Sequence, residues 1–325
     1  MPDPSVIARF LPFALAETHF ASLGPKYRGK VRDVYMPDER TRILVATDRQ
    51  SAFDRMWCTI PLKGQVLTQL SAWWFTQVQD VMPTHLIEVP DPNVMACKNL
   101  QMLKVEVVVR AYLTGSTVTS VWHHYQNGGR NMCGNALPDG MVRNQKLKEP
   151  ILTPTTKGEE DELIDSEGIV ERGLATQEQW EKITDRALAL FQRGQEVAAG
   201  RGLILVDTKY EMGIDENGVL TIADEVHTPD SSRYWVAATY DDRFSRGEEP
   251  ESLDKEFFRL WLRGQGFNPS DHAKPVPVIT DEVRVMLAGK YIDLYERMTG
   301  GTFVFPAEAN TTSRIEKNLA KYHKK

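Results

Sequence analysis

The chain has 325 residues, of which 41% are hydrophobic and 26% charged, and its formal net charge is −6 with a pI of about 5.7. This composition is typical of a globular protein, and the acidic balance gives no global electrostatic reason to bind nucleic acid. The three cysteines, Cys58, Cys97 and Cys133, form no CxxC pair, which argues against a disulfide framework or a structural zinc site. Without a signal-peptide pattern or a membrane-length apolar run, we expect a cytoplasmic protein that makes no membrane contact.

The first third of the chain alternates between strand-like and helical patterns. Residues 30–35 alternate polar and apolar side chains, and the apolar run 43–47 follows after a turn, which predicts a β-hairpin. Over 66–81 the apolar side chains recur at helical spacing. We therefore predict a helix there, with Trp73 and Trp74 packed in the core and not stacked on a ligand.

Patterned segments continue through the rest of the chain. The β-rich run 105–110 predicts a strand, and residues 116–125 predict a helix. The segment 133–166 is rich in Pro, Thr, Gly and acidic residues and predicts a long loop, which in a compact domain is usually functional or disordered. Further helices are predicted over 177–199, 253–262 and 281–299, and a fraying, solvated helix end over 317–325.

An Asn-Gly pair at 217–218 separates two β-like runs and predicts a hairpin with a two-residue type I′ turn. Counting outward from this turn places Glu211 opposite Asp224, and strand alternation puts Lys209 on the same face as Glu211. Two opposed carboxylates repel each other, but a bound Mg²⁺ would turn them into a ligand pair. Two interpretations remain open here: a solvated sheet face with mixed charges, and a metal site beside which Lys209 meets a phosphate.

Residues 24–30 match the GxxxxGK half of a P-loop. The next residue is Val31 instead of Ser or Thr, and a strand pattern follows instead of a helix, so we reject a P-loop NTPase. What remains is a strand entry on which Lys30 and Arg32 share one face. Such a face suits the phosphates of ATP, although exposed strands often carry cations without binding a ligand.

Two segments have the composition of anion-binding sites. A helix that begins at Gly115-Ser116 would offer free N–H groups and a positive dipole end, and Arg110 could add bidentate recognition. An ordinary helix cap with a surface arginine is the alternative. Residues 228–233 follow the acidic strand and combine hydroxyls with Asp230 and Arg233, which predicts a substrate-holding loop.

Several short segments occur in an order characteristic of one enzyme family. They are GKVRD at 29–33, ATDRQSAFD at 46–54, EVVVR at 106–110, TGS at 114–116, VDTKYEMG at 206–213, DEVHTPDSSRYW at 224–235 and DKEF at 254–257. Together they resemble SAICAR synthetase (phosphoribosylaminoimidazole-succinocarboxamide synthase) in its longer, yeast-like form. Lys104 and Met212 stand where the family usually has Pro and Phe, positions that supply no polar chemistry.

The resemblance implies an ATP-dependent ligase of de novo purine biosynthesis. Such an enzyme joins the carboxylate of carboxyaminoimidazole ribotide to the amine of L-aspartate, using ATP and Mg²⁺, and releases SAICAR, ADP and phosphate. The implied fold is α+β in two lobes. An N-terminal antiparallel lobe, residues 1–104, would cover the nucleotide, and a larger lobe of sheet and helices, residues 105–325, would carry the Mg-ATP hairpin and the substrate loops.

The resemblance also implies roles for individual residues. Lys30 and Arg32 would lie along the ATP phosphates. Lys209, Glu211 and Asp224 would be catalytic and hold the Mg-ATP end, with the two carboxylates as metal ligands. The expected substrate-binding residues are Arg110, Ser116 and Arg233 around the ribotide phosphate, Ser51, Asp230, Asp254 and Lys255 as additional contacts, and Lys157 and Asp161 on the aspartate side.

The expected chemistry requires no protein nucleophile. A carboxylate acylates poorly, whereas its acyl phosphate, formed from ATP, can be attacked by an amine, so the protein must position reactants and neutralise charge. The absence of Ser-His-Asp or Cys-His spacing agrees with this, and His227 is interpreted as a packing or surface residue. The alternatives are a small-molecule kinase with a similar Mg-ATP hairpin and a non-enzymatic β-rich binding module. The oligomeric state is left open.

Overall fold

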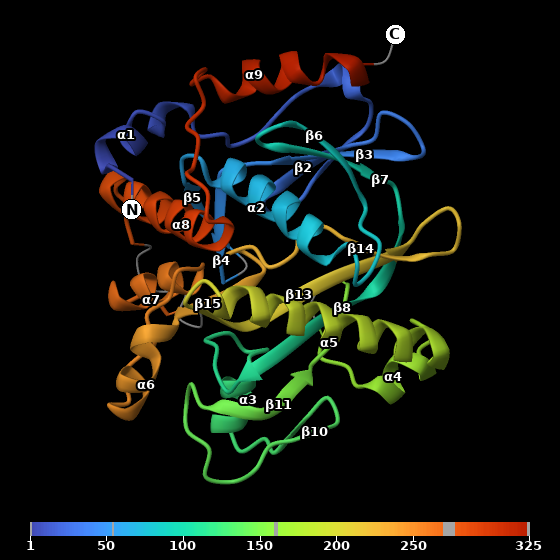
Figure 1. Cartoon of the computed structure of the whole chain (residues 1–325), viewed down its shortest axis with the longest axis vertical. Coiled ribbons are helices and arrows are strands. Elements are labelled where there is room, and N and C mark those ends of the chain that lie inside the picture. The colour runs from blue at the N-terminus through green and yellow to red at the C-terminus, as the bar shows by residue number, and fades with distance from the viewer. Residues whose placement is uncertain (1, 54, 159–161, 269–276, 324–325) are drawn as a thin grey trace.

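The computed structural model describes residues 2–53, 55–158, 162–268 and 277–323 and has an α+β fold with two main antiparallel sheets (Figure 1). The first sheet has the order β1-β2-β3-β7-β6. Its strands are β1 (Lys26–Arg28), β2 (Arg32–Tyr35), β3 (Thr41–Ala46), β6 (Leu86–Asp91) and β7 (Val94–Lys98). The prediction of an α+β fold, and that of a hairpin in the first third of the chain, are both confirmed.

The second sheet has the order β11-β8-β13-β14, with β12 added to β8 and β15 to β13. Its strands are β8 (Gln101–Tyr112), β11 (Lys146–Leu152), β12 (Thr155–Thr156), β13 (Leu203–Ile214), β14 (Leu220–Ala223) and β15 (Ser232–Val236). Two small hairpins accompany the sheets, β4 (Arg49–Ala52) with β5 (Arg55–Thr59) and β9 (Asn131–Met132) with β10 (Asn135–Ala136).

The helices pack on and between these sheets. They are α1 (Pro4–Ala8), α2 (Lys63–Val78), α3 (Val121–Gln126), α4 (Ser166–Glu171), α5 (Gln177–Ala199), α6 (Ala237–Ser245), α7 (Glu256–Gly264), α8 (Asp281–Thr299) and α9 (Thr311–Asn318). The predicted bounds of α5 and α8 are confirmed, because a capping box at Thr176 and a left-handed Gly300 mark ends that the sequence displays. No helix among the described residues is long and apolar enough to cross a membrane.

Helix α2 lies between the two sheets, and its side chains belong to a core cluster that includes residues of both (Figure 1). Trp74 is fully buried in a cluster that includes side chains of α5 and of the second sheet, and Trp73 packs against the same cluster. The prediction that both tryptophans belong to the core is confirmed. Burying such large rings stabilises the fold by roughly 1.5–3 kcal/mol for each side chain.

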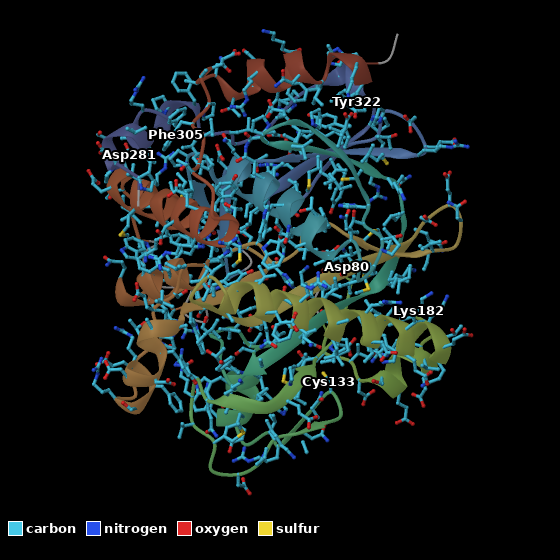
Figure 2. All side chains as sticks on the ribbon, viewed as in Figure 1. Asp80, Cys133, Lys182, Asp281, Phe305 and Tyr322 are labelled. Atoms are coloured by element: carbon cyan, nitrogen blue, oxygen red, sulfur yellow. The ribbon has the colours of Figure 1, made fainter. Side chains whose placement is uncertain are left out.

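The C-terminal helices return to the first sheet. Helix α8 contacts α1 and α2, and α9 contacts β6. Ile315 and Leu319 are fully buried there, and the guanidinium of Arg314 bonds both carboxylate oxygens of buried Asp91, at 3.0 and 3.1 Å. Figure 2 shows Tyr322 in the same region, where its hydroxyl donates to Glu88. The prediction of a fraying, solvated end is therefore wrong as far as residue 323, because an apolar stripe and a buried ion pair anchor the helix.

Two further sequence predictions are corrected by local hydrogen bonding. Helix α3 begins at Val121 and not at Ser116, because Ser120 is the residue whose hydroxyl caps the helix, accepting from the His123 N–H at 3.3 Å. The segment 133–166 is not a long loop in its described part. It forms β10, which pairs with β9, and it forms β11 and β12, which both pair with β8 of the second sheet.

The hairpin of β13 and β14 has a register one residue different from the predicted one. Glu211 is paired with Ala223, and the turn residues 216–218 follow Asp215, whose carboxylate accepts from the Val219 N–H at 2.9 Å. Only Gly218 in this turn has a positive φ, 77°, so the loop has three residues and not the type I′ geometry, which needs positive φ at two positions. The direct opposition of Glu211 and Asp224 is therefore wrong.

Candidate functional site

A cluster of carboxylates and lysines lies on β8, β13 and the loop after β12. The ammonium group of Lys209 bonds Glu106 at 2.7 Å and Glu211 at 2.9 Å, bridging the two strands. Lys157 also pairs with Glu211, from a half-exposed position. The structure thus places Lys157 next to the predicted metal hairpin, whereas Asp161 lies outside the described residues.

Asp224 joins this cluster despite the changed register. It follows the last residue of β14 and has a left-handed φ of 60°, which interrupts strand alternation. Its carboxylate bonds Arg32 of β2 at 2.7 Å and feels the negative charge of Glu211. The left-handed backbone thus keeps the two carboxylates close, although the ladder does not pair them. A non-glycine residue in this conformation carries backbone strain of about 1–3 kcal/mol, which is common at functional sites.

The two carboxylates have opposite proton affinities. Burial opposes ionisation of Glu211, but the charges of Lys209 and Lys157 prevail and lower its pKa to about 2. Burial raises the pKa of Asp224 to about 6, with Arg32 opposing the rise and Glu211 adding to it. A cation placed between them would favour the ionised form of both.

The donor set fits Mg²⁺ bound together with a nucleotide. Carboxylate oxygens are hard ligands, and Mg²⁺ usually takes one or two of them and completes its shell with water and substrate phosphates. Within the described part of the chain, no group of three or more His, Cys, Asp or Glu side chains is arranged to hold a metal ion. Beside Glu211 and Asp224, a bound Mg²⁺ would therefore need water and phosphate oxygens to complete its shell.

The segment 24–30, which matches half of a P-loop motif, forms strand β1 and the turn that follows it. Residues 31–40 contain strand β2 and no helix, so a P-loop NTPase is excluded. Lys30 lies in the turn between β1 and β2, and only Arg32 lies on the strand, so the predicted shared strand face is wrong. The guanidinium of Arg32 bonds Asp224 and Glu225, the latter at 2.8 Å, and thereby ties the first sheet to the end of the β13–β14 hairpin.

A second cluster surrounds Arg110 and Arg233. Both guanidinium groups approach one carboxylate oxygen of Asp207, at 3.8 Å from Arg110 and 2.5 Å from Arg233. Arg233 also pairs with Glu256, which in turn bonds Arg259 at 2.9 Å. Burial lowers the pKa of Arg110 to about 10, against the pull of Asp207. The sequence predicted the first two arginines. It did not predict Glu256, although this residue lies in the family segment at 254–257, or Arg259, which lies three residues further along α7.

Ser116 is near this cluster but does not begin a helix. Gly115 has a φ of 108°, and a Cβ there would lie 2.4 Å from the Ser120 Cβ, so the chain turns sharply before α3. The Ser116 hydroxyl is buried close to Glu256. Burial opposes ionisation of Glu256, but the charges of Arg233 and Arg259 prevail and, with a smaller contribution from Ser116, lower its pKa to about 2. The predicted helix-dipole contribution at Ser116 is therefore wrong, while its place beside the arginines is as expected.

A third cluster surrounds Asp230. One of its carboxylate oxygens bonds the fully buried Lys63 at 2.7 Å, and the other accepts from the Tyr291 hydroxyl at 2.7 Å. Lys255 lies 3.8 Å from the same carboxylate and donates to the Ser51 hydroxyl at 3.1 Å. Burial lowers the pKa of Lys255 to about 8, against the pull of Asp230. Lys63 was not predicted, because its helical segment gave it no pattern distinct from a surface lysine.

Asp254 has a different setting from its predicted neighbours. Its carboxylate accepts from the main-chain N–H of Tyr234 at 2.7 Å and of Glu256 at 2.6 Å, and from the Ser252 hydroxyl at 3.0 Å. These bonds attach the start of α7 to β15. In this structure Asp254 orders the segment that carries Lys255, and burial raises its pKa to about 6.

His227 is buried and not part of these clusters. One ring nitrogen contacts the Tyr210 hydroxyl, the other has no hydrogen-bond partner, and the ring lies edge-on to Trp74 at 4.6 Å. The interpretation of His227 as a packing residue is confirmed. Burial lowers its pKa to about 3.

This burial predicts a pH-dependent contribution to stability. In the unfolded chain a histidine has a pKa of about 6.5, so below that pH the unfolded state binds more protons and is favoured. We expect the stability difference between the wild type and His227→Asn, a residue that tolerates positive φ, to shrink below pH 6.5 by about 1.4 kcal/mol per pH unit. Urea unfolding at pH 7.5, 6 and 5 measures it. A difference that stays constant with pH would contradict the prediction.

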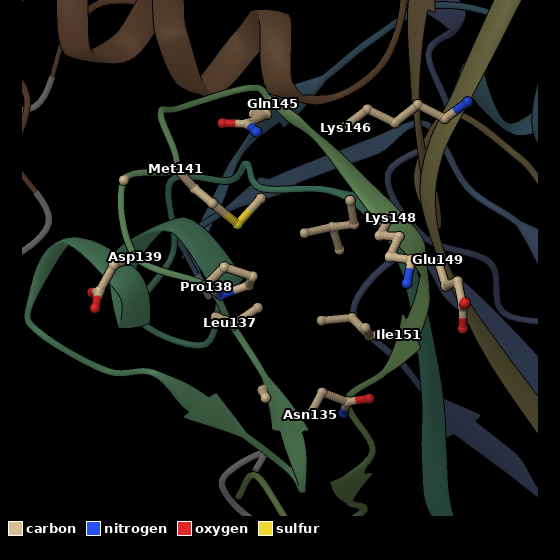
Figure 3. Close-up of a pocket in the computed structure, with 13 residues that line it drawn as sticks. Asn135, Leu137, Pro138, Asp139, Met141, Gln145, Lys146, Lys148, Glu149 and Ile151 are labelled. Atoms are coloured by element: carbon tan, nitrogen blue, oxygen red, sulfur yellow. The ribbon is translucent and has the colours of Figure 1, made fainter.

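A surface hollow lies elsewhere, beside strand β11 of the second sheet. Figure 3 shows it between the loop that carries Pro138 and Met141 and the strand that carries Lys148 and Ile151. None of the predicted site residues lines it. The charged clusters described above, and not this hollow, are therefore the candidate active site.

Comparison with known proteins agrees with this geometry. The model of the SAICAR synthetase family matches residues 25–275. A phosphoribosylaminoimidazole-succinocarboxamide synthase of Legionella pneumophila (strain Paris) is 48% identical over 319 residues, covering 96% of this chain and 99% of that protein. The SAICAR synthase of Saccharomyces cerevisiae, solved in complex with SAICAR, has a TM-score of 0.77 and 32% identity, covering 90% of this chain and all of that one. A SAICAR synthetase solved with ADP has a TM-score of 0.66 and 26% identity, covering 86% of this chain and all of that one. The chain therefore belongs to the SAICAR synthetase family.

Proposed function

We propose that this protein joins carboxyaminoimidazole ribotide to L-aspartate in purine biosynthesis, converting ATP to ADP and phosphate and releasing SAICAR. Family membership makes it an ATP-dependent ligase, as the sequence predicted. The observation that carries the assignment of the site is the junction where Lys209, Glu211 and Asp224 meet Arg32 of the other sheet. No comparable observation favours a small-molecule kinase or a binding module.

The nucleotide is assigned to the junction of the two sheets. Lys30 in the β1–β2 turn and Arg32 on β2 lie on the side of the first sheet, and Lys209 on β13 lies on the side of the second. Glu211 and Asp224 would hold Mg²⁺, whose charge neutralises phosphate oxygens when it is bound. The lobe of residues 1–104 would then cover the nucleotide, as the sequence predicts.

The ribotide is assigned to the arginine cluster. Its phosphate is dianionic and suits the forks of Arg110 and Arg233, which Asp207 and Glu256 hold in place. Asp230, Lys255 and Ser51 form the polar wall beside it, and Lys157 is left for the aspartate side. The nucleotide, the ribotide and the aspartate are thus each assigned to different side chains.

The reaction follows from the chemistry of carboxylates. The ribotide carboxylate attacks the γ-phosphorus of ATP and releases ADP, which gives an acyl phosphate. The neutral aspartate amine then attacks the acyl carbon and forms the C–N bond. The C–O bond to phosphate breaks, and the nitrogen gives up one proton to solvent and keeps the other in the amide. The side chains of this site orient the reactants and compensate negative charge, and no protein nucleophile is needed.

One assay tests the assignment. ADP release is measured with the complete mixture and with each of the ribotide, aspartate, ATP and Mg²⁺ omitted in turn. We expect sustained ADP release only in the complete mixture, with SAICAR formed in equal amount. Sustained release without aspartate would indicate a kinase, and no release under any condition would reject the enzyme assignment.

A further inference from the structure

Lys63 is a buried lysine at an unfavourable place. It is the first residue of α2, where the positive end of the helix dipole disfavours a cation, and its side chain is fully buried. Its ammonium group donates to the Arg49 carbonyl at 2.8 Å and to Asp230 at 2.7 Å. Because a buried charge is costly unless it is paired, the contact with Asp230 accounts for a lysine at this position.

Both carboxylate oxygens of Asp230 are bonded by residues of other elements. Lys63 of α2 bonds Oδ2, and the Tyr291 hydroxyl of α8 donates to Oδ1 at 2.7 Å. The Asp230 side chain is 3% exposed, and Tyr291 is fully buried. The match to the family model ends at residue 275, so Tyr291 lies on a helix beyond it. These two contacts fix the carboxylate and keep it out of solvent.

Lys255 is the second lysine beside this carboxylate. It lies 3.8 Å from Asp230 Oδ2, the oxygen that Lys63 occupies, and this distance is too long for a hydrogen bond. Among the described residues its ammonium group hydrogen-bonds Ser51 alone, at 3.1 Å, whereas an ammonium has three donors. Its side chain is 13% exposed, more than that of Lys63 or Asp230. Lys255 is therefore the member of this cluster that can bind a substrate anion.

The position of Lys255 identifies that anion. Its main-chain N–H donates to the Pro229 carbonyl at 3.1 Å, in the middle of the loop 225–233. This loop begins directly after Asp224, the proposed metal ligand, and ends at Arg233 of the arginine cluster. In the proposed function the first end holds the ATP phosphates and the second holds the ribotide phosphate. Because the ribotide carboxylate attacks ATP, it must lie between these two ends, beside Lys255.

We propose that Lys255 binds the reacting carboxylate of the ribotide, and that Lys63 is a positioning residue that keeps Lys255 available by occupying Asp230 in its place. Tyr291 assists by holding the other oxygen of Asp230. The inference rests on the proposed function, which supplies the substrate. It refines the role of Asp230, which orients the two lysines and does not itself touch the ribotide.

Two ribotides test the contact directly: carboxyaminoimidazole ribotide, and the same ribotide without its carboxylate. Binding of each is measured by calorimetry with the wild type, Lys63→Met and Lys255→Met. Both substitutions should weaken binding of the carboxylated ribotide by about tenfold or more, because Lys255→Met removes a charge-assisted hydrogen bond and Lys63→Met lets Asp230 capture Lys255. The ribotide without a carboxylate should bind all three proteins within about twofold of each other.

A second substitution separates positioning from a general loss of structure. In Lys63→Met/Asp230→Asn the carboxylate that would capture Lys255 is gone, so binding of the carboxylated ribotide should return to within about threefold of the wild type. If Asp230 itself bound the ribotide, Asp230→Asn would add to the loss instead. No recovery in the double variant, or an unchanged affinity in Lys63→Met, overturns the inference.

A second route to the same test uses Tyr291, should Lys63→Met not fold. Tyr291→Phe keeps the ring and frees one oxygen of Asp230 for Lys255. It should weaken binding of the carboxylated ribotide by about threefold or more, and Asp230→Asn in the same chain should restore it. An affinity that stays at the wild-type value in Tyr291→Phe would then contradict the inference.

A buried ion pair elsewhere provides the matched control. Arg314 of α9 and Asp91 of β6 belong to none of the three clusters. Arg314→Met should lower the melting temperature without changing the affinity for either ribotide. SAICAR formation by the wild type tests the proposed function separately, and if none is formed the assigned substrate and the inference fail together. If SAICAR is formed and Lys63→Met raises only the KM for aspartate, Lys255 binds the other substrate and the inference alone is wrong.

Discussion

Replacing Glu211 by Gln or Asp224 by Asn should lower kcat by roughly 100-fold or more, the scale on which removal of one charge-stabilising group acts in an active site. Each change replaces a carboxylate by an amide of the same shape, so the metal loses an anionic ligand while the side-chain volume is kept. Steady-state ADP release at saturating substrates and varied Mg²⁺ measures the effect. The loss should not be restored by excess ATP.

A matched control lies on the same hairpin. Glu216 is at its exposed tip and carries the same charge, so Glu216→Gln should leave kcat and the Mg²⁺ dependence unchanged. Thermal unfolding of all three variants shows whether the fold is intact. Near-normal Mg²⁺-dependent turnover in both Glu211→Gln and Asp224→Asn would reject the metal site.

The hairpin shows why the sequence predicted the two strands around 217–218 correctly but their register incorrectly. The Asn-Gly pair identified the turn, but the Asp215 side chain bonds the Asn217 and Val219 N–H groups and selects a three-residue loop. That interaction competes with the preference of Asn-Gly for a type I′ turn, and the dipeptide alone does not show which of the two is stronger. The left-handed backbone of Asp224 then compensates for the shifted register. Its carboxylate bonds Arg32 of the other sheet, a contact that the local sequence does not indicate.

Residues without a local pattern could not be predicted. Lys63 begins a helix, and its buried ammonium group pairs with the distant Asp230 and donates to the Arg49 carbonyl, contacts that no local pattern indicates. Glu256 and Arg259 acquire their role through Arg233, which is on a different element. Strong local signals such as the capping box of α5 sufficed for helices, whereas charge clusters depend on contacts between segments more than 20 residues apart.

By contrast, the Gly115-Ser116 pair predicts a helix start that the structure places five residues later, at Val121. Glycine followed by serine is a typical start of a helix, but Ser120 is a second serine that can cap one. Ser120 is the cap in the structure because it directly precedes Val121, the buried first residue of α3. The phosphate assignment therefore rests on arginines and not on a helix dipole. This sharpens the prediction for the ribotide, since guanidinium geometry is now its main physical basis.

Arg233→Lys and Arg110→Lys should each raise the KM for the ribotide by about tenfold or more, which corresponds to the loss of one charge-assisted hydrogen bond of about 1.5–3 kcal/mol. Lysine keeps the charge but lacks the planar fork that binds two phosphate oxygens at once. Asp207 and Glu256 orient that fork in Arg233, so a single ammonium cannot replace both contacts.

The KM for ATP decides whether the site has been divided correctly. It should change less than about twofold in either variant, because neither substitution removes a contact to ATP. A tenfold change in affinity would require the loss of about 1.4 kcal/mol. Arg246→Lys is the matched control, since Arg246 directly follows α6, is half exposed and pairs only with Asp242 and Glu248 among the described residues. Weaker ATP binding with an unchanged ribotide KM would mean that the arginine cluster holds the nucleotide, and the two substrates would have to exchange places.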